Sequence, residues 1–277
     1  CGYYVFKGYE YQRHNLVLLS KSLLENGMLA LTSPCGYTYL NIPSFSLMYI
    51  KEVEEYIAYT KDASILDEVG DVIKTIMKVM LDSIDETNLI KYFEDPVWNF
   101  YEWTEESFNL GVTSKNRHDL IINAMLLYVI PSYNRMFNEN IDLPKTKEAI
   151  QKYFYLEDEK VYKLHTDTEK YSQLGNSLCA LIGLGNDELL EKIIKDENMI
   201  TASLSMRCFL YDALLTNKDK YSNYIIEDIK MRYKKMLDAG ATSFWETEIG
   251  QADFDNAGSL CHGWSAIPIY YFNLLLK

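Results

Sequence analysis

The chain has 277 residues, of which 48% are hydrophobic, and a formal net charge of −13 at pH 7. This length and apolar content suffice for one sizeable core, so we expect a single domain over residues 1–277. The negative charge excludes nucleic acid and an anionic membrane surface as expected partners, because affinity for either depends on clustered Lys and Arg. No apolar run reaches the roughly 18 residues of a membrane-spanning helix.

Helical periodicity extends over almost the whole sequence. Apolar residues recur at spacings of three and four from Ile65 to Met80, and Asp62 is positioned to cap that helix. Gly27, Gly185 and Gly240 stand where helices would end, and Pro131 should end or kink its helix. Further helices are predicted over residues 9–26, 46–60, 115–136, 145–154, 171–184, 187–195, 201–215, 222–239 and 257–276.

One segment departs from this pattern, because residues 153–156 and 161–163 flank an acidic turn and predict a small β-hairpin. No tight repeat of fixed period is present, which disfavours consensus solenoids. The residues themselves leave two architectures open, a closed toroid of helical hairpins and an irregular helical bundle.

The cysteines and histidines give little sign of metal or redox chemistry. Five cysteines lie singly, without a CxxC pair, which favours a reducing, cytoplasmic compartment. His14, His118 and His165 have no second ligand at metal spacing. The sequence also lacks a P-loop, a GxGxxG turn and a GxSxG elbow. We therefore expect no metal and no cofactor.

The stretch from Ala241 to Trp264, ATSFWETEIGQADFDNAGSLCHGW, is a polar loop between two strongly helical segments. Hydrolysis of a sugar bond needs carboxylates to handle a proton and a water, and aromatic planes to hold the ring. The loop contains both kinds of group. An acidic loop is commonly a solvated connection, so this pattern alone leaves a catalytic and a structural role open. The residues concerned are Trp245, Glu246, Glu248, Asp253, Asp255, His262 and Trp264.

Two other loops are rich in aromatic residues. Residues 95–103, DPVWNFYEW, place large rings around Asn99 and Glu102, either as a substrate-facing wall or as a plug at the end of a helix pair. Residues 32–45, TSPCGYTYLNIPSF, join two helices, and Tyr37 and Tyr39 are candidates to line the same mouth.

Several of these segments resemble bacterial α-L-rhamnosidases of glycoside hydrolase family 78. TSFWE followed by GSLCHGWSAIPIYY resembles the family's closing segment, and WNFYEW resembles its aromatic loop. IPSFSLMYIKEVEEYIAYTKDASIL and KYSQLGNSLCALIGL resemble two of its helices, with Lys61 in place of a family glycine. The motifs occur in the family's order along nearly the whole chain. The resemblance implies an all-α fold, an (α/α)6 toroid of helical hairpins that here lacks its first helix.

The same resemblance implies inverting hydrolysis of terminal α-L-rhamnosides, with a carbohydrate as substrate. Glu246, which follows the FW pair, matches the general base, and the family's general acid lies upstream of the segment that CGYYVF resembles. The opening residues look like a chain entered in mid-helix, so we expect this chain alone to be inactive or nearly so. The substrate-binding candidates are Trp245, His262, Trp264, Trp98, Trp103 and Tyr37, with Glu102 and Glu248 as second-choice carboxylates.

Three other functions stay open at this point. A toroid that holds sugar without cleaving it, a toroid glycosidase for another sugar, and a helical interaction module without a sugar role are all compatible with the residues. The sequence does not determine the aglycone, the oligomeric state or export.

Overall fold

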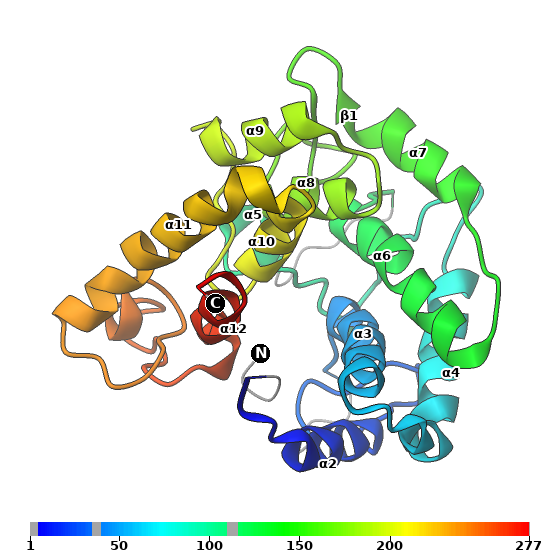
Figure 1. The fold of residues 1–277 in the computed structure, drawn as a ribbon. Helices are drawn as coiled ribbons and strands as arrows, with labels where there is room; N and C mark the ends of the chain where they lie inside the picture. Colours follow the sequence, from blue (N-terminus) through cyan, green and yellow to red (C-terminus); the bar gives the residue numbers. More distant parts are fainter. Residues whose placement is uncertain (1–4, 35–39, 110–115, 277) are drawn as a thin grey trace. The chain divides into compact units, whose positions relative to one another are not determined.

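The computed structural model describes residues 5–34, 40–109 and 116–276. The chain divides into two compact units, Tyr9–Ile200 and, in the other, Cys1–Gly8 with Thr201–Lys277. Within the described ranges there are eleven α-helices and one two-stranded sheet (Figure 1). The mostly helical fold expected from the sequence is therefore confirmed. Every helix in those ranges is too short or too polar to cross a membrane.

The larger unit is built from helices that pack in pairs. α3 packs against α6 and α6 against α8, while α4, α7 and α9 each pack on the helix that precedes them. α6 is apolar around most of its circumference and is buried on both sides, whereas α4 and α9 each bury a single stripe. The elements are α2 (Tyr9–Ser20), α3 (Pro43–Thr60), α4 (Leu66–Asp82), α5 (Glu105–Phe108), α6 (Leu120–Phe137), α7 (Pro144–Phe154), β1 (Tyr155–Leu156), β2 (Val161–Tyr162), α8 (Gln173–Leu181) and α9 (Asp187–Lys195).

The smaller unit contains α10 (Arg207–Leu215), α11 (Lys218–Asp238) and α12 (Ile267–Leu275). α11 packs against both of the other helices, and all three contribute buried side chains to the core of the unit. Residues 239–266 connect α11 to α12 and contain two short 3-10 turns, Gly250–Ala252 and Gly263–Ser265. This long connection holds the acidic and aromatic residues singled out above.

Several local predictions can be compared with the structure. β1 and β2 pair antiparallel, with Tyr155 opposite Tyr162, so the predicted hairpin is confirmed. Of the two outcomes expected at Pro131, an end or a kink of its helix, the structure excludes the first, since α6 continues to Phe137. Burial of α6 against two neighbouring helices offsets the hydrogen bond that a proline removes. α6 ends instead at Asn138, which adopts a left-handed φ of 53°.

The helix ends show where periodicity misleads. The segment 257–276 is helical only from Ile267, and α2 ends at Ser20, six residues before the predicted limit of residue 26. Gly240, with φ of 78°, follows α11 as predicted. Gly27 lies beyond the end of α2, and Gly183 rather than Gly185 has the left-handed backbone after α8.

Asp62 caps the 3-10 turn that leads into α4, as the sequence predicts. Its carboxylate accepts hydrogen bonds from the Ser64 hydroxyl and amide and from the Tyr56 hydroxyl at 2.7 Å, and it pairs with Arg13 at 3.3 Å. The Ser64 and Tyr56 hydroxyls lower the pKa of Asp62 to about 2. The ionised carboxylate thus joins three segments of the larger unit.

Replacing Asp62 with asparagine should lower the melting temperature at neutral pH. Because the folded pKa lies below the ordinary value of 3.8, the carboxylate contributes stability above pH 3.8 and loses it as the pH falls towards 2. Thermal melts of parent and variant should therefore diverge near neutrality and converge near pH 2. A difference that is independent of pH would contradict this role for the charge.

Candidate functional site

The α11–α12 loop folds back on itself so that two of its segments lie side by side. The Glu246 amide donates to the Ser259 carbonyl at 2.9 Å, and the His262 amide donates to the Phe244 carbonyl at 2.7 Å. These two bonds hold the segment 244–246 against the segment 259–262. Residues that are 16 positions apart, Glu246 and His262, are brought together in this way.

The Glu246 carboxylate is held at this junction. One oxygen accepts a hydrogen bond from the Ser259 amide at 3.2 Å, and the other lies 3.9 Å from His262 Nε2. The side chain of Glu246 is 14% exposed and that of His262 is 25% exposed. Ser265 is within 3.3 Å of His262 Nδ1 and donates to the Glu246 carbonyl at 3.4 Å. The carboxylate is fixed from one side and keeps limited access from the other.

The imidazole beside this carboxylate is biased towards its neutral form. Burial lowers the pKa of His262 below its ordinary value of 6.5, and the nearby charge of Glu246 offsets only part of that effect. At neutral pH the carboxylate therefore faces an uncharged ring. A neutral imidazole does not form an ion pair with the Glu246 carboxylate.

The two tryptophans of the loop play different parts. Trp264 is 46% exposed, and its ring lies 6.3 Å from the His262 ring, centroid to centroid. Trp245 packs on the backbone of Gly250, where a Cβ atom would lie 2.5 Å from the indole. Gly250 also has a left-handed φ of 66°, which glycine adopts without strain. Trp264 thus keeps a half-exposed indole close to the His262 ring, while Trp245 is fixed within the loop.

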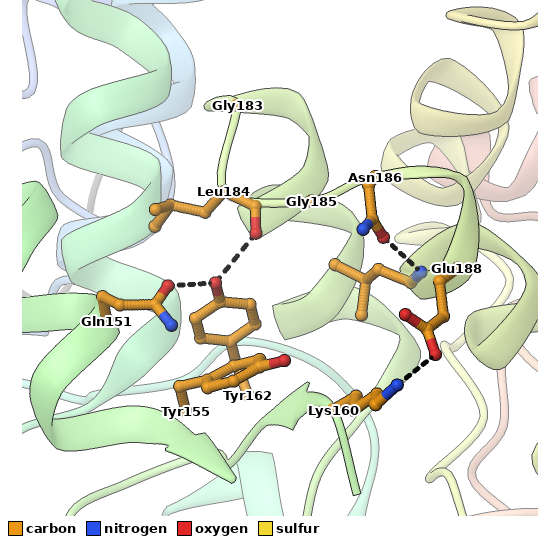
Figure 2. Close-up of a pocket in the computed structure, with 10 residues that line it drawn as sticks. Gln151, Tyr155, Lys160, Tyr162, Gly183, Leu184, Gly185, Asn186 and Glu188 are labelled. Atoms are coloured by element: carbon orange, nitrogen blue, oxygen red, sulfur yellow. Dashed lines mark hydrogen bonds and ion pairs between the residues drawn. The ribbon is translucent and has the colours of Figure 1, made fainter. Parts of the chain in front are cut away.

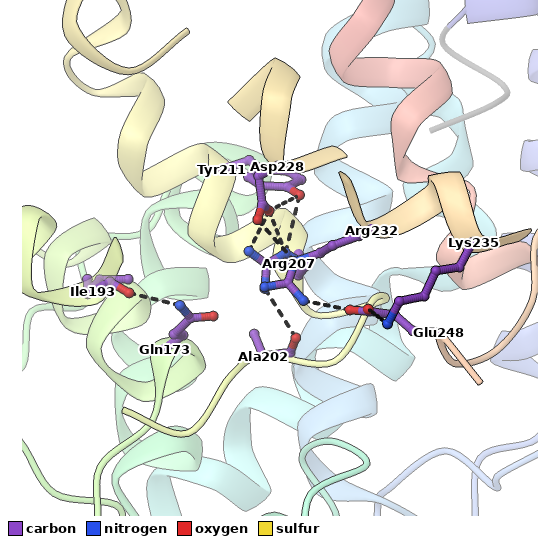
Figure 3. A network of polar contacts seen from close by, with 9 residues as sticks. All are labelled: Gln173, Ile193, Ala202, Arg207, Tyr211, Asp228, Arg232, Lys235 and Glu248. Atoms are coloured by element: carbon purple, nitrogen blue, oxygen red, sulfur yellow. Dashed lines mark hydrogen bonds and ion pairs between the residues drawn. The ribbon is translucent and has the colours of Figure 1, made fainter. Parts of the chain in front are cut away.

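Glu248 belongs to a chain of charged groups that ties the loop to the helices (Figure 3). Arg232 on α11 donates to Glu248 at 2.5 Å and to Asp228 at 3.0 Å, and Lys235 lies 3.6 Å from Glu248. Asp228 in turn accepts from Arg207, a fully buried guanidinium on α10, at 2.9 and 2.5 Å. Glu248 is therefore engaged in anchoring the loop.

The aromatic loop lies in the larger unit and forms a cluster of its own. The rings of Trp98, Phe100, Trp103 and Phe108 lie with centroids 4.8 to 6.4 Å apart. The Trp98 indole donates to the Phe108 carbonyl at 2.6 Å. Both tryptophans remain partly exposed, whereas Glu102 is fully buried. The structure thus brings Trp98 and Trp103 together in one aromatic cluster.

A buried network of polar side chains is hydrogen-bonded to residues of the aromatic loop. Asp119, at the start of α6, accepts from Arg117 at 2.5 Å and from the Tyr101 hydroxyl at 3.0 Å. Arg117 also donates to Asn109 at 3.1 Å, and Asn109 donates to the Asn99 carbonyl at 2.9 Å. The network therefore holds the aromatic loop at Asn99 and Tyr101. Tyr37, the remaining predicted site residue, lies outside the described residues.

Some residues that shape the site were not among the sequence-based candidates. Ser259 and Ser265 orient Glu246 and His262, and Arg232 binds Glu248. The two serines lie in the GSLCHGWS segment, which the sequence already marked by its resemblance to the family's closing segment. Arg232 is one of many charged residues on α11. Only the tertiary structure shows that this one contacts the loop.

Gly258 provides a test of how closely the loop is packed. A Cβ atom there would lie 2.0 Å from the Gly250 carbonyl oxygen, so the Gly258→Ala backbone must shift. We expect this substitution to lower stability by about 1–3 kcal/mol, the usual cost of overpacking, and to displace Ser259 and Glu246. Gly263→Ala is the matched control, because a Cβ atom there meets nothing within 4 Å. Urea denaturation of both variants measures the difference, and equal stabilities would contradict the packing.

Comparison with solved structures gives a consistent result. A rhamnosidase from Klebsiella oxytoca with rhamnose bound superposes with a TM-score of 0.80 at 18% identity, covering 98% of this chain. The family 78 rhamnosidase of Bacillus sp. GL1 gives 0.78 at 21% identity over 95% of this chain. The chain has the fold of the family 78 α-L-rhamnosidases. An α-L-rhamnosidase of Dictyoglomus thermophilum agrees, with a TM-score of 0.66 at 18% identity over 96% of the chain.

This rhamnosidase fold corresponds to only part of the solved enzymes. The chain spans 55% of the Klebsiella oxytoca protein and 29% of the Bacillus protein. A scan of the sequence against models of protein families finds no match, and a search of curated proteins finds none either. The likeness is therefore one of three-dimensional structure at low sequence identity.

Proposed function

We propose that this chain is the helical domain of a glycoside hydrolase that cleaves terminal α-L-rhamnosides. Two observations support the proposal together. The fold matches solved rhamnosidases over nearly the whole chain. The segment that the sequence singled out also holds a carboxylate, Glu246, near an imidazole that burial biases towards its neutral form, and the half-exposed indole of Trp264 lies close to that imidazole. The second observation carries the proposal, because function depends on the site rather than the fold.

In the proposed reaction Glu246 acts as the general base. It takes a proton from a water molecule whose oxygen attacks the anomeric carbon, while a carboxylic acid elsewhere protonates the departing glycosidic oxygen. Such inverting chemistry needs roughly 6.5 to 9.5 Å between the two carboxyl groups, which leaves room for the water. Trp264 and His262 contact the sugar ring, and Trp98 and Trp103 form an aromatic wall. Glu248 acts indirectly, as an anchor of the loop.

The same proposal includes the architecture. In the larger unit α3 packs against α6 and α6 against α8, each of these three helices is followed in the chain by a helix that packs on it, and α10 and α11 form a further pair in the smaller unit. An (α/α)6 toroid is the closed form of such repeated helix pairing.

Two measurements on the full-length protein test this function. The first compares release of nitrophenol from aryl α-L-rhamnoside with release from aryl glucoside, galactoside and glucuronide. The second follows a methyl or aryl rhamnoside by proton NMR to identify the anomer that forms first. We expect selective cleavage of the rhamnoside and a first product of inverted configuration. Binding of rhamnose without turnover would instead indicate a sugar-binding toroid.

A further inference from the structure

The larger unit contains a pocket of about 370 Å³ that is distinct from the loop described above. Its walls are the end of α7, the β1–β2 hairpin, and the α8–α9 connection with the first turn of α9 (Figure 2). Every wall belongs to the same compact unit, so the geometry of the pocket is fixed within it. A volume of this size lies within the range of ordinary small-molecule sites.

Two tyrosines of the hairpin form one side of the pocket. The rings of Tyr155 and Tyr162 lie 5.0 Å apart, centroid to centroid, at an angle of 52°. Figure 2 shows the hydroxyl end of Tyr155 directed between Tyr162 and Lys160. Tyr162 is buried, and burial raises its pKa, so its hydroxyl keeps its proton. Tyrosine combines a flat apolar face with a polar edge, the combination that suits a sugar ring.

The polar groups beside these rings are uncharged. The Tyr162 hydroxyl lies 2.8 Å from the Leu184 carbonyl and 2.5 Å from the Gln151 side-chain oxygen. One hydroxyl proton serves only one of these acceptors, so a Gln151 amide turned to present its nitrogen satisfies all three groups. In that arrangement the amide oxygen is left to accept a hydrogen bond from a ligand.

The charged groups of the pocket cancel each other. Lys160 donates to Glu188 at 2.7 Å, with both side chains about half exposed. The first turn of α9 carries Asp187 and Glu188, which disfavour an anion at that helix end. Asn186 already caps the helix by accepting from the Leu189 amide at 3.1 Å. The lining therefore favours a neutral ligand over a phosphate, a carboxylate or a cation.

We propose that this pocket is a second carbohydrate site, which binds one or two neutral sugar units without cleaving them. Tyr155 contacts the apolar face of the ring, while Gln151 and the backbone around Gly183 receive its hydroxyl groups. The pocket offers no carboxyl pair to carry out hydrolysis, since Glu188 is engaged with Lys160. The inference is drawn from this lining alone and does not depend on rhamnoside cleavage.

A titration with methyl α-L-rhamnopyranoside and methyl β-D-galactopyranoside tests the pocket. Saturation-transfer NMR on the full-length Trp264→Ala protein, which lacks one proposed sugar contact of the α11–α12 loop, reduces the contribution of that loop to the signal. We expect a saturable signal with a dissociation constant on the order of 1 mM, ordinary for a small neutral ligand. Adding Tyr155→Ala should weaken it about fivefold to tenfold, as for loss of an aromatic platform. Methyl glucuronide, which is anionic, should give a weaker signal.

Two further variants keep the outcome clear. Gln151→Ala removes a lining group from an exposed helix position, and it should weaken binding even if Tyr155→Ala disturbs the hairpin. Tyr153→Ala is the matched control, because Tyr153 lies on α7 beside Lys152 and does not line the pocket. Binding that neither Tyr155→Ala nor Gln151→Ala alters would overturn the proposal. Cleavage of an aryl rhamnoside by Tyr155→Ala with Trp264 intact reports on the proposed hydrolysis separately and should match that of the parent.

Discussion

Replacing Glu246 with glutamine should lower turnover of an aryl α-L-rhamnoside by a factor of about 10² to 10⁴, the range expected when a general base is lost. Glutamine keeps the shape of the side chain and can still accept from the Ser259 amide, the contact that holds Glu246 at 3.2 Å. The loop should therefore stay folded. An amide does not take a proton from water at neutral pH, so the loss should appear in kcat more than in KM.

The control for this substitution is Glu227→Gln on α11. Glu227 is 71% exposed and pairs with Lys230 at 2.8 Å, an exposed contact within α11 that does not involve the loop. Its removal should leave turnover and stability nearly unchanged. Turnover of Glu246→Gln within a few-fold of the parent would show that another group is the base. A melting temperature equal to the parent's would confirm that the variant tests chemistry rather than folding.

The second large effect concerns Asp228 and the buried charges around it. Asp228→Asn removes the carboxylate that faces Arg207, whose side chain is wholly buried, and Arg232. Leaving one member of a buried ion pair without its counter-charge costs about 3–5 kcal/mol. We expect a loss of that size in the free energy of unfolding, measured by urea denaturation. The Tyr211 hydroxyl, which donates to Asp228 at 2.7 Å, does not supply the missing charge.

A paired substitution shows whether the cost arises from charge. In Arg207→Met with Asp228→Leu both charged groups are absent, and apolar side chains of similar volume occupy their places, so much of the stability should return. A change of less than about 1 kcal/mol in Asp228→Asn, typical of an exposed pair, would contradict the role assigned to this network. Because Arg232 links Asp228 to Glu248, Asp228→Asn should also loosen the loop that carries Glu246.

The two effects differ in their origin. Glu246 and Glu248 are two residues apart in one loop, yet they face different partners, Ser259 and His262 for the first and Arg232 for the second. Substitution of Glu246 should therefore change the rate with little change in stability. Substitution in the Asp228 network should change stability first and the rate through the position of the loop.

The sequence by itself determined the helical class, most of the helices and the loop that contains the candidate site. Apolar residues at spacings of three and four indicate which face of each helix is buried. This pattern is local, so it can be read from the sequence without the tertiary structure. The hairpin at 155–162 and the cap at Asp62 were equally readable, because turn and cap residues act on their own neighbours. Composition likewise gave the cluster of carboxylates and rings from Trp245 to Trp264.

Tertiary structure alone decided which of those residues act together. Periodicity extended the last helix back to residue 257, whereas hydrogen bonds between segments 244–246 and 259–262 keep that region as a loop and set His262 beside Glu246. α6 is buried on two sides and continues past Pro131, although proline locally disfavours a helix interior. Arg232, on a charged helix, became the partner of Glu248 only because the loop returns to α11. These features depend on contacts between distant residues, which no local pattern of side chains encodes.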